Sequence, residues 1–446
     1  MSRTLQRRKQ RITSFRIIAS GFFVLILIGT LLLMLPAARQ TDAPVRFLDC
    51  LFTATSAVCV TGLVVQDTAS FWSPFGQAVL LLLIQIGGMG VVTTAVSISH
   101  LSGRRIGLMQ RSVMQESISA PQLGGIVRLT RFLVLTALGM EGIGALLLLP
   151  EMTRSFGWGS GVWFAVFHAV SAFCNAGFDL MGVRAPYSSL TGYAMNPWVN
   201  FVIMLLITLG GIGFLVWQDV REYGLRWKTY RLQSRVAILT SGLLHALGAL
   251  WLYFFELQEL PPQSRILPSL FQSVTLRTAG FNTVDLNRIS GSGQSLMILL
   301  MLVGGSPGST AGGMKTTTLA VVLVTAWRVI RREDDVHLLG RRVAEETVRH
   351  AFAILVLYGL LFYASGLAMA RVERLPLMAC LFEAASALGT VGLTLGITGQ
   401  LGAASRLILI LLMFLGRVGG LTLAYAAQSG WNVGRSTRPM EKLNVG

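Results

Sequence analysis

The chain has 446 residues, of which 53% are apolar and only 13% are charged, and its formal net charge is +17. An ordinary soluble domain carries roughly 25% charged residues, so the composition excludes a mainly soluble protein. Apolar stretches of about the 20 residues that cross a bilayer occur at 15–36, 75–99, 132–149, 199–217, 236–255 and 407–427. The sequence therefore predicts a polytopic membrane protein with little room for a soluble domain.

The basic residues lie in short segments between apolar ones, and no soluble module offers a basic face that could bind nucleic acid. These segments are 3–11, 104–111, 221–235, 328–342 and 435–442. Cytoplasmic loops carry an excess of Lys and Arg, so we expect these segments, and both termini, in the cytoplasm. The acidic residues expected outside are Asp42, Asp67, Asp179, Glu256, Glu259 and Asp285.

Residues that commonly bind metals or catalyse reactions are scattered. The four cysteines, Cys50, Cys59, Cys174 and Cys380, show neither a metal-binding spacing nor a disulfide framework. His168 is expected to be a packing residue. With no cluster of His, Cys or carboxylate side chains, the sequence predicts neither an enzyme nor an organic cofactor on this chain.

Four short segments resemble one another, which is the signature of an internal repeat. Each contains a Phe near its start, a small hydroxyl residue in the middle and a Gly near its end. They read LFTATSAVCVTGL (51–63), VFHAVSAFCNAGF (166–178), LFQSVTLRTAGF (270–281) and LFEAASALGTVGL (381–393). Their hydroxyl residues are Ser56, Ser171, Thr275 and Ser386, and the third copy is one residue shorter after Thr275.

Each repeat has the same order of segments. An apolar span is followed by an external linker, the short segment, and a second apolar span with glycines near its middle. The short segments cannot cross a bilayer but suit a re-entrant helix. The predicted fold is all-α, with four tandem helix–pore-loop–helix repeats around one ion pathway, comprising about eight transmembrane helices and four re-entrant pore helices. The repeats are 1–110, 111–230, 231–343 and 344–446, the last with a C-terminal tail.

The glycines near the ends of the short segments predict an ion-selectivity filter. Glycine permits backbone angles that direct successive carbonyl groups at an axis, and rings of carbonyls replace an ion's hydration shell in potassium channels. Glycines that pack two helices explain one copy but not four, although this alternative suits the mid-span glycines of the first two repeats. The predicted filter residues are Cys59, Val60, Thr61, Gly62, Cys174, Asn175, Ala176, Gly177, Arg277, Thr278, Ala279, Gly280, Gly389, Thr390, Val391 and Gly392.

With one Gly per filter and Arg-Thr-Ala-Gly-Phe-Asn at 277–282, the chain resembles the Trk/Ktr/HKT superfamily of potassium transporters over about residues 15–430. Its length resembles the Ktr membrane subunit, KtrB, more than the longer TrkH. The resemblance implies potassium uptake across the bacterial inner membrane, often helped by sodium. It also implies a homodimer on a cytoplasmic KtrA-like ring of nucleotide-binding regulators.

The second span of the third repeat is interrupted by a segment that cannot sustain a helix. Its residues are Gly304, Gly305, Ser306, Pro307, Gly308, Ser309, Thr310, Ala311, Gly312, Gly313, Met314 and Lys315. Such a segment suits a loop that lines a cavity below the filter, and in the family this is the intramembrane gating loop. A phosphate-binding loop is rejected, because Met314 separates Gly313 from Lys315 and no strand precedes the segment.

Four ionisable residues fall within or beside apolar spans. Arg417 takes the slot that glycines hold in the other repeats, and we interpret it as an electrostatic barrier beside the gating loop. The alternative is that it partners carbonyls or a buried acid. Lys315 either extends to the cytoplasmic surface or neutralises loop carbonyls. Glu141 is expected toward the external end of its span, within reach of solvent.

Arg277, the fourth of these residues, lies in the third filter segment itself. Because an arginine facing the ion path would repel cations, we expect it to point away and to bind a carboxylate, either Asp285 or Glu383.

Two rival functions share parts of this pattern. A transporter built on inverted repeats and broken helices would need two units of opposite topology, whereas these four units run in the same direction. A sodium-permeable or poorly selective cation transporter of the same superfamily is closer. Members with Ser in the first filter position tend toward sodium, and Gly62 occupies that position here, so potassium is preferred.

Overall fold

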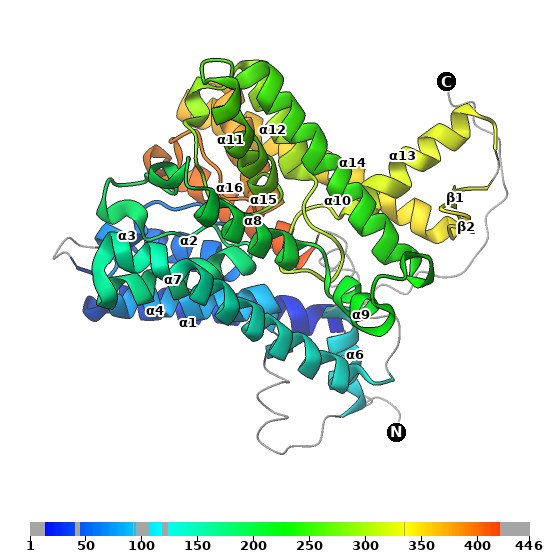
Figure 1. The fold of residues 1–446 in the computed structure, drawn as a ribbon, viewed down its shortest axis with the longest axis horizontal. Coiled ribbons are helices and arrows are strands. Elements are labelled where there is room, and N and C mark those ends of the chain that lie inside the picture. Colours follow the sequence, from blue (N-terminus) through cyan, green and yellow to red (C-terminus); the bar gives the residue numbers. More distant parts are fainter. Residues whose placement is uncertain are drawn as a thin grey trace, which may run out of the picture.

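The computed structural model describes residues 14–40, 45–91, 93–94, 107–117, 124–333 and 335–419. Most of these residues form helices, many of which run along one common direction (Figure 1). The predicted basic segments at 3–11 and 435–442, the residues Arg104 and Arg105, and the tail beyond residue 419 lie outside the described residues.

Four helical stretches among the described residues are long and apolar enough to cross a membrane. They are Arg16–Met34 within α1 (Ser14–Met34), Ile126–Phe173 (α7), Leu232–Glu256, which joins α10 (Leu232–Trp251) to the π-helical turn η5 (Leu252–Glu256), and Glu345–Glu373 (α14). Each begins one of the sequence repeats. The predicted apolar stretches at 15–36, 132–149 and 236–255 coincide with the first three.

In each repeat a helix ends within the second apolar span. The helices are α4 (Pro74–Met89), α8 (Pro197–Gly211) with α9 (Phe214–Tyr223), α12 (Gly291–Leu302) with α13 (Thr316–Ile330), and α16 (Ala403–Val418). The sequence predicted one span at 199–217, and a single helix there was wrong: α8 and α9 meet at 94°. The predicted spans at 75–99 and 407–427 lie partly outside the described residues. Gly90, Gly213 and Gly419 have φ of 88°, 103° and 91°, and such angles end a right-handed helix.

Three of these second helices begin at a side-chain cap. Ser73 accepts a hydrogen bond from the amide of Gly76, and Ser290 accepts one from the amide of Gly293. Asn196 accepts from the amides of Trp198 and Val199. These residue types satisfy the free amides of a helix's first turn. In these three repeats the external linker therefore fixes where the next helix begins.

Short helices precede the filter segments. They are α2 (Phe47–Val58), α11 (Pro262–Thr275), α15 (Leu377–Gly389) and the part of α7 that follows the kink at Gly157, where φ is 77°. α1 packs on α2, α10 on α11, and α14 on α15. Contacts between α4 and α7, α8 and α11, α12 and α15, and α16 and α2 join each sequence repeat to the next and the fourth to the first. The contacts form a closed cycle.

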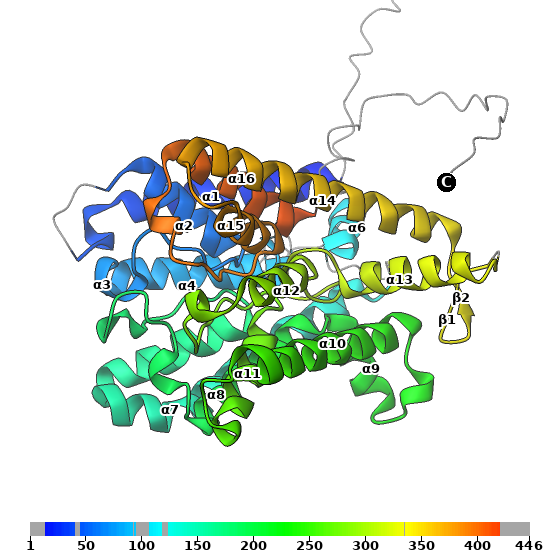
Figure 2. The same ribbon diagram turned by 90° about the horizontal axis from the view of Figure 1, so that it is seen from above.

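The remaining elements connect these helices. They are α3 (Thr68–Phe71), α6 (Leu108–Ser117), the 3-10 turns η1 (Pro36–Ala38), η2 (Met181–Val183), η3 (Thr191–Tyr193), η4 (Trp227–Thr229), η6 (Leu286–Arg288) and η7 (Thr398–Gln400), and a hairpin of β1 (His337–Leu338) and β2 (Arg341–Arg342). Figures 1 and 2 both place this hairpin and α9 toward one end of the molecule and α3 toward the other. The predicted cytoplasmic linkers at 221–235 and 328–342 therefore share an end.

One ion pair joins the last sequence repeat to the first. Arg406 on α16 donates to the carboxylate of Asp49 on α2, and both side chains are largely buried. A second donor of Arg406 reaches the carbonyl of Gly399 at 3.0 Å. This charge-assisted contact strengthens the packing that closes the cycle.

Replacing Asp49 with Asn should lower the apparent free energy of unfolding by roughly 1.5–3 kcal/mol, because a hydrogen bond to a charged group is lost in a dry site. The measurement is thermal unfolding of the purified protein in detergent. Arg288→Met provides the control, since Arg288 forms its ion pairs on an exposed surface, where such pairs contribute little. Equal losses in the two variants would contradict the assignment.

Candidate functional site

The four glycines that the sequence predicts to form a filter lie around a common axis. A Cβ atom added to Gly62 would lie 2.5 Å from the carbonyl oxygen of Ala176, and one on Gly177 would lie 2.8 Å from that of Ala279. A Cβ atom on Gly280 would lie 2.6 Å from the oxygen of Val391, and one on Gly392 would lie 2.1 Å from that of Thr61. Each glycine thus faces the carbonyl that precedes the glycine of another segment, and a side chain at any of them would clash.

The backbone of the four segments repeats one unusual conformation. Two residues before each glycine, Val60, Asn175, Thr278 and Thr390 have φ of 50°, 58°, 69° and 51°. The glycines themselves have φ of 93°, 71°, 78° and 93°. Non-glycine residues rarely adopt positive φ, and four equivalent cases indicate a shared geometric demand. The backbones of the four segments therefore approach one another closely.

The hydroxyl residue of each repeat holds its filter segment. The side chains of Ser56 and Ser386 each accept a hydrogen bond at 3.0 Å from the filter glycine six residues later. Ser171 and Thr275 instead donate to the carbonyls of Phe178 and Phe281, at 2.6 and 2.7 Å. The sequence pattern had marked these residues, but their function as braces was not predicted.

The one-residue deletion in the third copy has a local structural counterpart. In the other three segments the residue before the glycine donates its amide to a carbonyl five residues earlier, as Thr61 does to Ser56 at 2.8 Å. In the third, Ala279 donates to Thr275, four residues earlier, at 3.0 Å. The shorter segment therefore reaches the same position by a tighter turn.

The glycine-rich segment that interrupts the third repeat lies directly against two filter segments. The hydroxyl of Thr310 bonds the side chain of Asn175 at 2.9 Å and the carbonyl of Phe173 at 3.1 Å. A Cβ atom on Gly312 would lie 2.2 Å from the hydroxyl oxygen of Thr390. The segment is thus a buried loop in contact with the second and fourth filters, where the sequence predicted it.

Other glycines let this loop contact its neighbours. Its backbone is bonded to α8 and α9, since Ser306 donates to the carbonyl of Gly211 at 2.9 Å and the amide of Phe214 donates to Gly308 at 2.6 Å. In the second spans, a Cβ atom on Gly87 would lie 2.0 Å from the carbonyl of Val58. That contact confirms the packing interpretation of the mid-span glycine in the first repeat.

Two cations bind the carbonyl groups of this loop. Arg417 on α16 donates to the carbonyl of Thr310, and to those of Gly87 and Gly88 on α4 at 2.5 and 2.9 Å. Lys315 donates to Ala311 at 2.8 Å and to Gly312 at 3.4 Å. Of the alternatives that the sequence left open, the structure shows carbonyl partners for both residues.

A cavity of about 220 Å³ lies beside these cations. Its walls include Gly308, Ser309 and Ala311 of the loop, together with Lys315 and Arg417. Arg417 therefore both ties the loop to α4 and places a positive charge on the wall of a space below the filter segments.

Arg277 is buried, but its predicted carboxylate partner was wrong. Its guanidinium donates to the carbonyl of Gly304 at 2.6 Å. Of the two candidate partners, Asp285 faces Arg288, and Glu383 accepts hydrogen bonds from the hydroxyls of Thr394 and Thr398. A backbone carbonyl supplies the acceptor, and the sequence pattern could not reveal it because every residue has one.

Glu141 also differs from expectation. Its side chain is only 4% exposed and accepts hydrogen bonds from Gln85 at 3.0 Å and from the thiol of Cys174 at 3.6 Å. It lies beside the second filter segment, so the expected access to solvent was wrong. A carboxyl group this deep needs polar partners, and Gln85 was the available signal in the sequence.

His168 is a satisfied core residue, as predicted. Its ring bonds the carbonyl of Phe164 at 2.7 Å and the amide of Leu180 at 3.3 Å. Among the residues that the structure describes, no three His, Cys, Asp or Glu side chains gather to hold a metal ion.

Comparisons with known proteins agree with this architecture. The TrkH family, described as cation transport protein, matches residues 3–434. The Ktr system potassium uptake protein B of Bacillus subtilis is 38% identical over 95% of this chain and 96% of its own. The potassium/sodium uptake protein NtpJ of Enterococcus hirae is 36% identical over 94% of each chain.

A solved structure shows the same fold. The crystal structure of the potassium transporter TrkH from Vibrio parahaemolyticus superimposes with a TM-score of 0.74, at 20% identity, over 94% of this chain and 85% of that one. The prediction of a mainly α-helical, polytopic membrane fold is confirmed.

Removing the brace of the fourth filter should destabilise the protein. Ser386→Ala leaves the buried amide of Gly392 without its acceptor, which costs about 1–3 kcal/mol. The control is Ser405→Ala, because Ser405 is equally buried but its hydroxyl has no hydrogen-bond partner in the described structure. Thermal unfolding in detergent should separate the two variants, and an equal effect would contradict the brace.

Proposed function

From the premise that the chain belongs to the TrkH family of cation transport proteins, we propose that it is the potassium-uptake membrane subunit of a Ktr-type system. Its relatives named as Ktr system potassium uptake protein B support the substrate and the system. The protein is then a multi-pass membrane transporter, not an enzyme. By the distribution of basic residues it lies in the bacterial inner membrane with both termini in the cytoplasm.

The single observation that carries the proposal is the closed arrangement of the four filter glycines. Each allows the carbonyl of Thr61, Ala176, Ala279 or Val391 to approach the centre more closely than a side chain would permit. An oxygen ring of this kind replaces the hydration shell of K⁺. Because positive φ occurs only at two positions of each segment, we assign one tight ion site at this level.

The buried loop below the filter is proposed as the gate. Its hydrogen bonds to Asn175 and to Arg417 hold it across the path that an ion would take to the cavity. A cation passing this point meets the positive charges of Arg417 and Lys315, which raise the local electrostatic energy. Displacing the loop with Arg417 would lower both the steric and the electrostatic barrier.

The regulated assembly is a further part of the proposal. Relatives named Ktr system potassium uptake protein B belong to Ktr systems, and on this basis we propose a homodimer on a KtrA-like cytoplasmic ring. Sodium has two alternative roles in this proposal: it either stimulates potassium uptake or is itself a second transported ion. The relative named as a potassium/sodium uptake protein keeps the second alternative open, while Gly62 favours potassium.

The filter is tested by Gly392→Ser in potassium-transport-deficient bacteria that express the chain with a Ktr-type regulator. A Cβ atom at Gly392 would collide with the carbonyl of Thr61, so the KM for K⁺ should rise by roughly tenfold or more, equal to about 1.4 kcal/mol of lost binding. Uptake is measured with and without sodium.

Gly396→Ser is the matched control for this variant. Gly396 has a similar φ of 87°, yet among the described residues no atom beyond its own chain neighbours lies within 4 Å of where its Cβ atom would stand. It should keep the wild-type KM. Uptake that is indifferent to Gly392, or a flux of sodium alone, would show that the filter or the ion is wrongly assigned.

Arg417→Gln tests the barrier. Loss of the charge and of the contact with Thr310 should raise the maximal K⁺ flux by roughly tenfold, which corresponds to about 1.4 kcal/mol of barrier, with little change in KM. Arg371→Gln, on an exposed turn of α14, removes one charge far from the path and should leave the flux unchanged. An unchanged flux in Arg417→Gln would eliminate the barrier and leave Arg417 a structural brace.

A further inference from the structure

An arginine-lined pocket lies where the first turns of α7 meet α9. Its volume is about 900 Å³. The walls carry the guanidinium groups of Arg128, Arg131, Arg221 and Arg231, with Glu222 as the acidic lining residue. The pocket is separate from the cavity beside Arg417, since the two share no lining residue.

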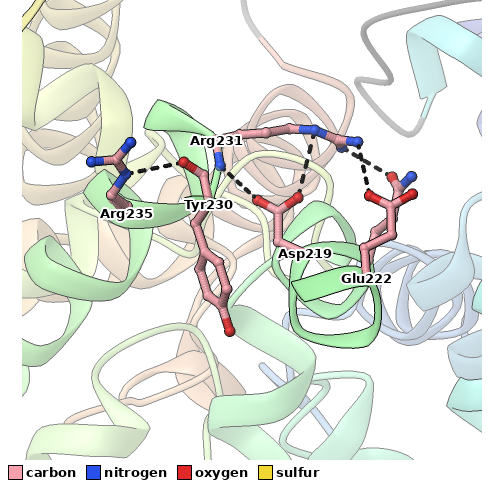
Figure 3. A network of polar contacts seen from close by, with 6 residues as sticks. Asp219, Glu222, Tyr230, Arg231 and Arg235 are labelled. Carbon is pink, nitrogen blue, oxygen red and sulfur yellow. Dashed lines mark hydrogen bonds and ion pairs between the residues drawn. The ribbon is translucent and has the colours of Figure 1, made fainter. Parts of the chain in front are cut away.

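One of the four arginines already has its counter-charges. Arg231 lies 3.5 Å from Asp219 and 3.8 Å from Glu222, and donates to Gln218 at 3.0 Å (Figure 3). Its backbone amide also donates to Asp219 at 3.0 Å. This network fixes α9 against the start of α10, and it engages both carboxylates with Arg231.

The other three arginines, Arg128, Arg131 and Arg221, line the pocket together with a single carboxylate, Glu222. In the described part of the chain neither Arg128 nor Arg131 forms an ion pair with a carboxylate, and Arg221 lies over the ring of Phe132 at 4.5 Å. Three fixed positive charges around one cavity repel one another. A phosphate group suits this arrangement, because guanidinium groups bind its oxygens in paired hydrogen bonds.

The apolar part of the wall indicates where the phosphate comes from. Leu129, Phe132 and Leu135 line the same pocket, and Leu135, one turn beyond Arg131, is 58% exposed. These residues continue along α7 toward its membrane-spanning part. A soluble phosphate would need only the arginines, whereas a lipid would use both the charged end and the apolar wall.

We propose that this pocket binds the headgroup of an anionic phospholipid from the cytoplasmic leaflet, with its acyl chains along Leu129, Phe132 and Leu135. Basic pockets between membrane helices on this side are suited to such headgroups. The assignment rests on the membrane orientation proposed above, but not on the ion that is transported.

A lipid bound in the pocket would influence the proposed gate through α9. Arg221 lies two turns along α9 from Phe214, whose amide donates to Gly308 in the buried loop at 2.6 Å. A headgroup that bridges Arg128 and Arg131 to Arg221 would hold α9 against α7, and with it one attachment point of the loop.

The test measures binding, so that its outcome does not depend on transport. The purified full-length protein in neutral detergent is titrated with dioleoyl phosphatidylglycerol or dioleoyl phosphatidylcholine, and bound lipid is counted by native mass spectrometry while thermal unfolding is followed. Phosphatidylglycerol should bind and raise the melting temperature, and phosphatidylcholine should not. Equal binding of the two lipids would overturn the proposal.

The triple variant Arg128→Gln, Arg131→Gln, Arg221→Gln should weaken phosphatidylglycerol binding at least tenfold. The matched control is Arg331→Gln, Arg332→Gln, Arg341→Gln, which removes the same charge from the same end of the molecule and should keep wild-type affinity. Equal loss in the two would mean general charge attraction and overturn the site. If the Gln variant does not fold, the three Arg→Lys changes provide the comparison, with a smaller loss expected because Lys lacks the paired donors.

The last set of titrations uses inorganic phosphate and glycerol 3-phosphate in place of the lipids. Neither should raise the melting temperature as phosphatidylglycerol does, because neither contacts the apolar wall. Stabilisation by these soluble compounds to the same extent would overturn the lipid assignment in favour of a free phosphate ligand. Potassium uptake that fails while the lipid arms succeed would count against the proposed function alone.

Discussion

The need to satisfy backbone polar groups at membrane depth is the constraint on which the rest of this structure depends. Hydrocarbon offers no hydrogen-bond partner, so non-helical backbone is tolerated there only when protein or water supplies one. Such segments among the described residues include the four predicted filter segments and the glycine-rich loop at 304–315. The short helices, the hydroxyl braces and the buried cations each supply partners to one of them. The architecture around the axis follows from this demand.

The three buried cations have one structural role in common, which follows from this constraint. Arg277, Lys315 and Arg417 all donate to carbonyl groups of the loop at 304–315. An unpaired buried cation is costly, and ion pairs with carboxylates would neutralise these residues. Carbonyl partners give these residues hydrogen bonds without removing their charge. Two of them, Lys315 and Arg417, also line the cavity beside the loop, so Arg417 both holds the loop and carries a positive charge at that cavity.

The features that could be predicted from the sequence are those that recur along the chain. Hydropathy located three of the four long helices, while the fourth, Glu345–Glu373, followed only from the order of segments in the repeat. Four copies of one segment located the predicted filter glycines and their hydroxyl residues. The wrong predictions concern features that occur at one position only. The breaks at Gly90 and Gly213 depend on backbone angles that a glycine permits but does not impose. The partner of Arg277 and the depth of Glu141 depend on packing between distant segments, and a carbonyl acceptor leaves no mark in the residue sequence.

The four repeats are not equivalent, because their hydroxyl residues form two different kinds of hydrogen bond. This difference matters for how the proposed gate could act. The hydroxyls of the first and fourth segments accept from the filter glycine, whereas those of the second and third donate to a carbonyl beyond it. The loop in turn contacts the second, third and fourth segments, through Thr310 to Asn175, Gly304 to Arg277 and Gly312 to Thr390. We expect a movement of the loop to act first on these three segments. Their braces differ, so the three segments would not yield equally. The second and third, whose side chains are hydrogen-bonded directly to the loop, are the more direct routes between the proposed gate and filter.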